Sequence, residues 1–323
     1  MKNYNLIIMP LYILSIMFSI SSNAWLTMWI GMEMNLLTFI FILLEEKSLN
    51  SIECTMKYFL IQSAGSTLFL FSMGSHMIFY NEMFMISAIL TPIALILKSG
   101  MAPLHTWTPP IVMKFNPKSL FLFLSMQKIT PVIILFSSWS TMFKWVIFVN
   151  IIIGSIGGVT QSSFQKMMVY SSINNSGWMM MSISESLFLF MLFFITYLFM
   201  TKMLLNFMEQ NKIKWMIQIN SCGMEAKIHY VSMMISMSGL PPFIGFLPKW
   251  MIVKKTILVM PLLTYTSVVM SFFTLYFYMK SCISMCLTSE CSKKWKINLI
   301  NSHSGSLLTI SNLMILPMFF SLT

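Results

Sequence analysis

The sequence predicts an all-α polytopic membrane protein of about eleven transmembrane helices, and three observations carry this prediction. Of the 323 residues, 57% are apolar and only 9% are charged, whereas soluble domains average about 25% charged residues. The apolar residues form long runs, and a helix needs about 20 of them to cross the hydrocarbon core of a bilayer. These runs are far longer than the strands of a membrane barrel, so we expect helices, which satisfy their own backbone groups.

The expected spans follow these apolar runs along the chain. Two of them, 83–112 and 228–253, contain Gly and Pro and are expected to be interrupted helices. The longest loops, about 208–227 and 287–303, have room for only a short surface helix, so we expect a single transmembrane domain over residues 1–323. In order, the expected spans are about residues 4–22, 24–44, 56–80, 83–112, 118–140, 144–164, 167–183, 186–207, 228–253, 259–286 and 304–322.

The charged residues are all lysines and glutamates, twenty and nine respectively, with a net charge of +11. The lysines lie in short loops between apolar runs rather than in one block, which indicates membrane topology and not nucleic-acid binding. With the N-terminus on the positive side, thirteen loop lysines lie on that side and three on the other. This imbalance predicts that orientation and an odd number of spans. Because Arg is absent, no cleaved mitochondrial import peptide is expected.

The cysteines give no pattern for a metal or redox site. The five of them contain no CxxC pair. Cys282 and Cys286 lie one helical turn apart, but two thiols are too few ligands for a structural metal ion. We therefore expect no metal or cofactor in this chain.

Four ionisable residues lie so deep inside the expected spans that the cost of a charge there needs an explanation. Glu33, Lys98 and Lys128 lie near the middle of their spans, and Lys249 lies nearer the far side of its own. A charged side chain at the bilayer centre costs about 2.5 to 3.5 kcal/mol on insertion scales, so such residues are normally paired, hydrated or functional. These four are therefore candidate site residues.

The two interrupted spans share one design. Residues 95–107 read LILKSGMAPLHTW and residues 238–250 read SGLPPFIGFLPKW, so each has a Ser-Gly pair, nearby prolines and a lysine. A proline in a helix interior costs about 3 kcal/mol. The second copy follows five spans later and would enter the membrane from the opposite face. This predicts an inverted repeat, with the first copy over about 1–140, the second over about 144–286 and the last helix apart.

Interrupted helices in transporters line a hydrated cavity near the middle of the membrane. We expect the break after Lys98 to open the backbone to water, so that the amine exchanges a proton. Burial disfavours a charged amine and a nearby carboxylate favours it, so the approach and withdrawal of Glu33 would switch Lys98. Lys128 would take the proton onward, with His105 and water between them. His105 lies in the broken segment, and histidine titrates near neutral pH.

Five motifs resemble the family of mitochondrial NADH dehydrogenase (ubiquinone) subunit 2, an antiporter-like membrane subunit of respiratory complex I. The resemblance runs over nearly the whole chain. It implies the short form of the antiporter fold, with eleven spans. The motifs are SNAWLTMWIGMEMNLLTF (22–39), LKSGMAPLHTW (97–107), MQKITPVI (126–133), GSIGGVTQSSFQKMMVYSSI (154–173) and SGLPPFIGFLPKW (238–250).

The resemblance also implies roles for the candidate residues. Glu33 matches the family's membrane glutamate, Lys98 the lysine of the first broken helix, and Lys128 the lysine of the central axis. Lys249 matches the lysine toward the exit, and His105 matches a histidine near the first break. The implied function is proton translocation coupled to quinone reduction elsewhere in the complex.

The same resemblance implies a setting. Flavin, iron–sulfur clusters and quinone are expected in partner subunits, with none of them in this chain. The expected partners are other membrane-arm subunits of complex I and lipids. The expected place is the mitochondrial inner membrane, with the N-terminus on the matrix side and the C-terminus on the intermembrane-space side.

One departure from the family pattern falls in the second repeat. Before Gly177-Trp178 the family usually reads Ser-Ile-Asn-His, whereas this chain has Asn174-Asn175-Ser176. An amide therefore stands at a titratable relay position. Two alternatives stay open for this span: it conducts through waters held by Ser171, Ser172, Asn174 and Asn175, or it does not conduct at all.

Two other functions stay open at the level of sequence. A stand-alone cation/proton antiporter is disfavoured by the scarcity of buried acids, because a cation site needs hard oxygen ligands with compensating charge. A passive structural subunit is the other alternative, with its buried lysines stabilised by Glu33 and water.

Overall fold

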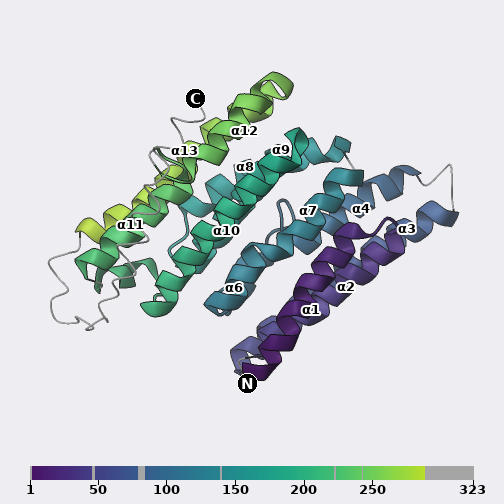
Figure 1. Ribbon diagram of the computed structural model, residues 1–323, viewed down its shortest axis with the longest axis horizontal. Helices are drawn as coiled ribbons and strands as arrows, with labels where there is room; N and C mark the ends of the chain where they lie inside the picture. Colours follow the sequence, from purple (N-terminus) through teal and green to yellow (C-terminus); the bar gives the residue numbers. More distant parts are fainter. Residues whose placement is uncertain are drawn as a thin grey trace. The chain divides into compact units, whose positions relative to one another are not determined.

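The computed structural model describes residues 2–45, 48–78, 84–138, 140–221, 223–241 and 243–287, and it is helical almost throughout these ranges (Figure 1). Within them, β-pairing is limited to an isolated bridge between Ser163 and Trp215. The chain divides into two compact units, Met1–Val146 and Ile147–Thr323. The boundary falls inside α8 (Ser140–Val159). The last expected span, 304–322, lies outside the described residues, so the expected number of spans stays a prediction.

The first unit is a bundle in which neighbouring helices pack in pairs. α1 packs along α2, α3 along α4, and α4 against α7. Aromatic rings fill its core, where the centroids of Phe39 and Tyr58 lie 5.2 Å apart. Its helices are α1 (Lys2–Ser21), α2 (Trp25–Leu43), α3 (Leu49–Ile78), α4 (Phe84–Ser99), α5 (Thr108–Val112), α6 (Pro117–Leu124) and α7 (Met126–Ser138).

The second unit is built around α9 (Phe164–Glu185), which is buried along most of its length although it is rich in Ser and Asn. α9 packs against α10 and α12, and α11 packs against α13. The other elements are α10 (Leu187–Gln210), the 3₁₀ helix η1 (Met216–Ser221), α11 (Met224–Ser238), α12 (Phe246–Val259) and α13 (Pro261–Leu287).

Five stretches of the described residues are long and apolar enough to cross a membrane on their own. Two shorter apolar helices, Ile7–Ser21 and Ile89–Ser99, also lie within the described residues. The five stretches are Trp25–Leu43, Pro117–Ser137, Met142–Val159, Leu187–Gln210 and Pro261–Ile283.

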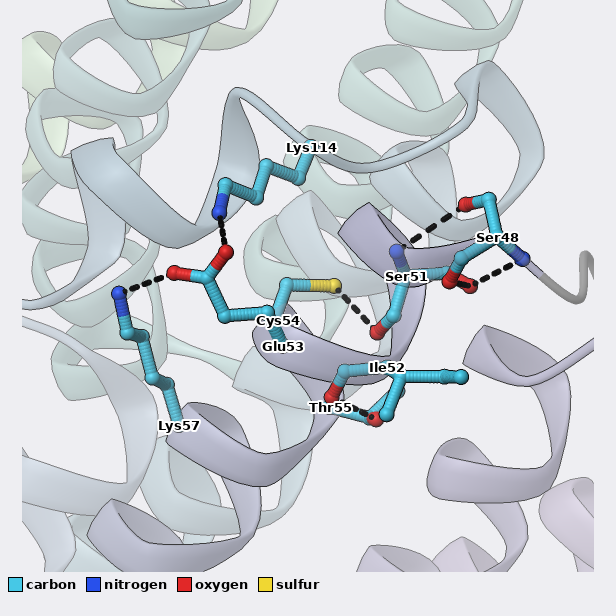
Figure 2. A network of polar contacts seen from close by, with 8 residues as sticks. All are labelled: Ser48, Ser51, Ile52, Glu53, Cys54, Thr55, Lys57 and Lys114. Atoms are coloured by element: carbon cyan, nitrogen blue, oxygen red, sulfur yellow. Dashed lines mark hydrogen bonds and ion pairs between the residues drawn. The ribbon is translucent and has the colours of Figure 1, made fainter.

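The helix expected from residue 56 begins earlier, at Leu49, and Figure 2 shows why. The Ser51 backbone N–H donates to Ser48 Oγ, and the Ser48 backbone N–H donates to Ser51 Oγ, each at 3.1 Å. This reciprocal pair is a capping box, which satisfies two backbone donors at a helix start. The prediction placed the start too late because hydropathy marks the apolar run and not its polar first turns.

Glu53 ties the start of α3 to the segment after α5 (Figure 2). Its carboxylate accepts a bond from Lys57 Nζ at 2.6 Å, one helical turn along, and another from Lys114. Hydrogen bonds from Lys114 and Lys57, together with their charges, lower the pKa of the Glu53 carboxyl to about 2. The network lies at the exposed end of the helix, outside the apolar run.

The span expected at 118–140 is not one helix, because it breaks at Ser125 between α6 and α7. Pro131 lacks an N–H to bond the carbonyl of Gln127, and its ring crowds that carbonyl. Ser125 Oγ also donates to the Phe121 carbonyl at 2.5 Å, a back-bond that bends helices. Lys128 therefore lies in the first turn of α7 rather than in the middle of a long helix.

Both predicted interruptions are present, and they are built alike. α4 ends at Ser99 before Gly100 at φ 64°, and α11 ends at Ser238 before Gly239 at φ 81°. In each case the glycine N–H donates to the carbonyl three residues back, at 3.2 Å for Gly100 and 3.1 Å for Gly239. The N–H of the following residue donates to the carbonyl five residues before it, at 3.2 Å after Gly100 and 3.5 Å after Gly239. These are the bonds of a Schellman motif, whose left-handed position favours Gly.

Candidate functional site

The structure brings Lys98 and Glu33 together in the first unit. Lys98 is the second-last residue of α4 and only 8% exposed. Its Nζ lies 3.4 Å from Oε1 of Glu33 on α2, whose side chain is 26% exposed. The charged pair thus lies beside the first helix break, and the carboxylate compensates a cation that burial alone would destabilise.

Gln62, on α3, satisfies the backbone at the same break. Its Nε2 donates to the Lys98 carbonyl at 2.8 Å in a buried position. This carbonyl is among those that the helix end leaves without an intrahelical partner. Gln62 thereby holds the end of α4 while the Lys98 side chain remains directed to Glu33.

Lys98 is one of the residues that line a small polar cavity. About 20 Å³ of it is open to the centre of a water molecule, and roughly 10 to 15 Å³ by this measure is enough for one water. It is lined by residues of α2, α3, α4 and α7, namely Met32, Asn35, Leu36, Tyr58, Gln62, Lys98, Gln127, Thr130 and Pro131. The break therefore has polar space for one water molecule.

Two amides join α2 to α7 across this cavity. Gln127 Nε2 donates to Asn35 Oδ1 at 3.0 Å. Asn35, Gln62 and Gln127 were not among the candidate residues predicted from the sequence. The available signal was that each is an amide inside an expected span, Asn35 two residues after Glu33 and Gln127 directly before Lys128.

Lys128 and His105 do not line the cavity. Lys128 is buried at 3% exposure in the first turn of α7, whereas the residues of α7 that line the cavity are Gln127, Thr130 and Pro131. His105 is partly buried, with Nδ1 3.1 Å from the carbonyl oxygen of Pro103. The predicted route from Lys98 through His105 to Lys128 therefore stays a prediction.

Lys249 has a different environment in the second unit. It lies in the first turn of α12, and its Nζ donates to the carbonyls of Ser238 at 2.9 Å and Met237 at 3.4 Å. The amine also lies 5.8 Å from the ring centroid of Trp178, within cation–π range. Among the described residues, no carboxylate oxygen lies within 4.0 Å of it.

The polar face expected along the second repeat is buried in α9. Ser171, Ser172, Asn174 and Asn175 are all at most 5% exposed. Asn174 Oδ1 and Trp178 Nε1, one turn apart, are buried without a hydrogen-bond partner among the described atoms. The helix therefore carries polar groups beside Lys249, but no titratable side chain replaces the absent histidine at position 175.

The described residues contain no group of three or more His, Cys, Asp or Glu placed to hold a metal ion. Cys54 and Cys282 are both buried, and the Cys54 thiol donates to the Ser51 carbonyl at 3.1 Å.

Comparison with known proteins identifies the family. The family described as NADH:quinone oxidoreductase/Mrp antiporter matches residues 22–274. NADH-ubiquinone oxidoreductase chain 2 of Anopheles gambiae is 32% identical, over 96% of this chain and 94% of that one. The chain 2 of Artemia franciscana is 35% identical, over 93% of this chain and 95% of that one.

Solved structures share the fold at low sequence identity. A chain of respiratory complex I from Thermus thermophilus with bound aureothin matches with a TM-score of 0.77 and 17% identity, over 95% of this chain and 78% of that one. A chain of the Mrp complex from Dietzia sp. DQ12-45-1b matches with a TM-score of 0.71 and 13% identity, over 85% and 58%. The family match spans most of the chain, and relatives above 30% identity cover more than nine tenths of it, so the chain belongs to the NADH-ubiquinone oxidoreductase chain 2 family and is a membrane-arm subunit of respiratory complex I.

Proposed function

We propose that this chain translocates protons across the mitochondrial inner membrane, with Lys98 as a proton carrier whose charge is controlled by Glu33. The observation that carries the proposal is the pair itself, 3.4 Å from Nζ to Oε1, beside a helix break and a polar cavity. Paired ionisable residues inside a membrane span mark functional sites. A permanent structural pair would need no polar cavity beside it.

The switching step follows from charge and burial. With Glu33 close, the ammonium form of Lys98 is favoured, because the carboxylate compensates its charge. When the carboxylate withdraws, burial favours the neutral amine and a proton leaves toward the cavity. The attraction between the Lys98 ammonium and the Glu33 carboxylate is inversely proportional to their separation, with an effective dielectric constant of about 20 in a protein. A movement of Glu33 by a few ångströms is therefore enough to weaken it.

The remaining candidates extend this path. Lys128 is the proposed next carrier, and His105 with water is the proposed link to it. Lys249 is the proposed carrier toward the exit in the second unit, where α9 offers buried hydroxyls and amides beside it. Quinone reduction in partner subunits, which carry the flavin and iron–sulfur clusters, drives the movement. The proposed topology has the N-terminus in the matrix and the C-terminus in the intermembrane space.

The test is the number of protons moved per electron pair. Complex I carrying Lys98→Met or Lys249→Met is reconstituted into vesicles, after its assembly has been verified, and proton uptake is measured during NADH oxidation. We expect both substitutions to lower this ratio. Lys202→Met, at an exposed position of α10, is the control and leaves it unchanged. An unchanged ratio with Lys98→Met in the assembled complex would overturn the proposal.

A structural role for Lys249 is a second candidate, and its bonds to the carbonyls of Ser238 and Met237 favour it. In that case Lys249→Met lowers the thermal midpoint of the complex and leaves the proton-to-electron ratio unchanged. The same vesicle measurement therefore separates the two roles.

A further inference from the structure

The amide pair beside Lys98 has no part in the carrier function described so far. Asn35 lies two residues after Glu33 on α2, and Gln127 lies directly before Lys128 on α7. Their hydrogen bond of 3.0 Å uses one N–H of Gln127 and the oxygen of Asn35. Each primary amide has one acceptor oxygen and two N–H donors. The pair therefore keeps an acceptor on Gln127 and donors on Asn35 for a further partner.

The cavity supplies the place for that partner. Both amides line it together with Lys98, and the space of about 20 Å³ fits a single water molecule. Buried waters typically make about three hydrogen bonds. The ammonium of Lys98, the oxygen of Gln127 and the amide N–H of Asn35 provide two donors and one acceptor of the right kinds.

We propose that Gln127 and Asn35 are positioning residues that hold one water molecule against the Lys98 amine, an inference that rests on the proton-carrier function proposed above. Gln127 orients the water because its oxygen accepts a water O–H, which turns a water lone pair toward Lys98. The water then accepts the proton: an N–H bond of the ammonium breaks and an O–H bond forms. Lys98 becomes a neutral amine and the water becomes hydronium, so the total charge of the cavity is unchanged.

The hydrogen bond between the two amides also fixes where the water lies relative to Glu33. Asn35 and Glu33 share α2, so a shift of that helix moves the carboxylate and one wall of the cavity together. Withdrawal of Glu33 from Lys98 is then accompanied by movement of the residue that binds the water. The amide pair thus links release of the ion pair to the presence of an acceptor for the proton.

The experiment uses the assembled complex. Gln127→Leu removes the amide at similar volume, and Asn35→Gln with Gln127→Asn exchanges the two amides while keeping their summed length. Asn150→Leu, at a buried amide of the second unit, controls for loss of a buried polar group. The readouts are water density beside Lys98 in a high-resolution map, the rate of proton-coupled NADH oxidation and its dependence on pH.

We expect a water within about 3.2 Å of Lys98 Nζ in the unsubstituted complex and its loss in Gln127→Leu. Coupled turnover should fall by up to about 100-fold, as for misplacement of a reacting group by about 1 Å. The pH dependence of turnover should also change, which a purely structural amide would not cause. The exchanged pair should recover most of the rate, and Asn150→Leu should keep both rate and pH profile.

Two results would overturn the inference. One is an unsubstituted complex with no water at this position, which decides the question even where Gln127→Leu does not assemble. The other is an assembled Gln127→Leu complex with normal coupled turnover. If Lys98→Met lowers the proton-to-electron ratio while Gln127→Leu has no effect, this inference alone fails. If Lys98→Met also leaves the ratio unchanged, the proton-carrier function fails with it.

Discussion

The two units end their broken helices with the same backbone motif but satisfy the freed carbonyls differently. In the first unit, the carbonyl of Lys98, two residues before Gly100, accepts from Gln62, a neutral amide on another helix. In the second unit, the carbonyl at the matching position, Met237, and the one after it accept from the Lys249 amine. The amide frees the first lysine to pair with a carboxylate, whereas the second lysine is bound to backbone.

Lys98 thus has a movable partner, the Glu33 carboxylate, whereas Lys249 has fixed partners, the backbone carbonyls. A carboxylate side chain changes rotamer, so the environment of Lys98 can alternate. Backbone carbonyls at a helix end carry the negative end of the helix dipole and stay in place. The first unit therefore gives its buried lysine a side-chain partner, whereas the hydrogen-bond partners of Lys249 in the second unit are backbone carbonyls.

The largest expected effect comes from two glycines that are packed closely against the broken helices, Gly245 against α11 and Gly65 against α4. In the second unit, a Cβ at Gly245 would overlap the backbone carbonyl oxygen of Ser236. In the first, a Cβ at Gly65 would lie 2.9 Å from Cγ of Lys98 and 3.1 Å from Cδ2 of Leu97, which are side-chain atoms and not backbone. Gly245→Ala should cost about 3 kcal/mol or more, since backbone must move, and should abolish assembly.

Gly65→Ala should cost less, about 1 to 2 kcal/mol, and should leave an assembled complex with a displaced Lys98. Native gel electrophoresis and the thermal midpoint measure both substitutions. Equal losses at the two positions would contradict the distinction between backbone and side-chain neighbours.

The next effect tests the movable partner. Lys98→Met leaves the Glu33 carboxylate partly buried without its cation and should destabilise by about 1 to 3 kcal/mol, below the range for fully buried pairs. Glu33→Gln in the same chain should restore most of the thermal midpoint, because it removes the uncompensated charge. For Lys249→Met, the same Glu33 substitution should give no recovery. Recovery in both backgrounds would show that the lysines share one electrostatic environment.

A smaller loss is expected when the neutral amide is removed. Gln62→Leu orphans the buried carbonyl of Lys98 and should cost about 1 to 2 kcal/mol, seen as a lower thermal midpoint. Ser63→Ala, on the exposed side of the same helix, is the matched control, because Ser63 Oγ only back-bonds the Leu60 carbonyl within its own helix. If Ser63→Ala lowered the thermal midpoint as much, the loss would come from any substitution in α3 and not from the orphaned carbonyl at the break.

The smallest effect belongs to the exposed ion-pair network of the first unit. The pKa of Glu53, lowered from 4.5 to about 2 by Lys114 and Lys57, means that its stabilisation is complete above about pH 4.5 and is lost as pH falls toward 2. Glu53→Gln should lower the thermal midpoint slightly and equally from about pH 5 to about pH 8. High salt should shrink the difference. A difference that titrates near neutral pH would contradict this assignment.

Sequence reasoning predicted what depends on residue type along the chain. Long apolar runs predicted the helices, and Ser-Gly followed by Pro predicted both interruptions, because Gly adopts positive φ at low cost. The pairing of Glu33 with Lys98 was predicted from their shared depth. The break at Ser125 was missed, because hydropathy marks the extent of an apolar run and not a break within it.

The hydrogen-bond partners of the polar groups at the helix breaks could not be predicted from the sequence in the same way. Gln62 and Gln127 are single amides in apolar spans, and no periodicity tells which carbonyl or amide each one meets. The carbonyl partners of Lys249 depend on how α12 packs on the end of α11, which is a property of three-dimensional packing. Residue types thus indicated which positions need a partner, and tertiary structure decides the partner.

Because of the interruption at Ser125, two lysines of the first unit lie at opposite ends of their helices, Lys98 at a C-terminus and Lys128 at an N-terminus. Lys98 occupies the last turn of α4, at the negative end of that helix's dipole, which attracts positive charge. Lys128 occupies the first turn of α7, at the positive end of that helix's dipole, which repels it. Such end effects amount to roughly 0.3 to 1 kcal/mol at exposed sites. A positive charge thus has a downhill preference for the end of α4 over the start of α7, and any transfer between them must be driven against this gradient.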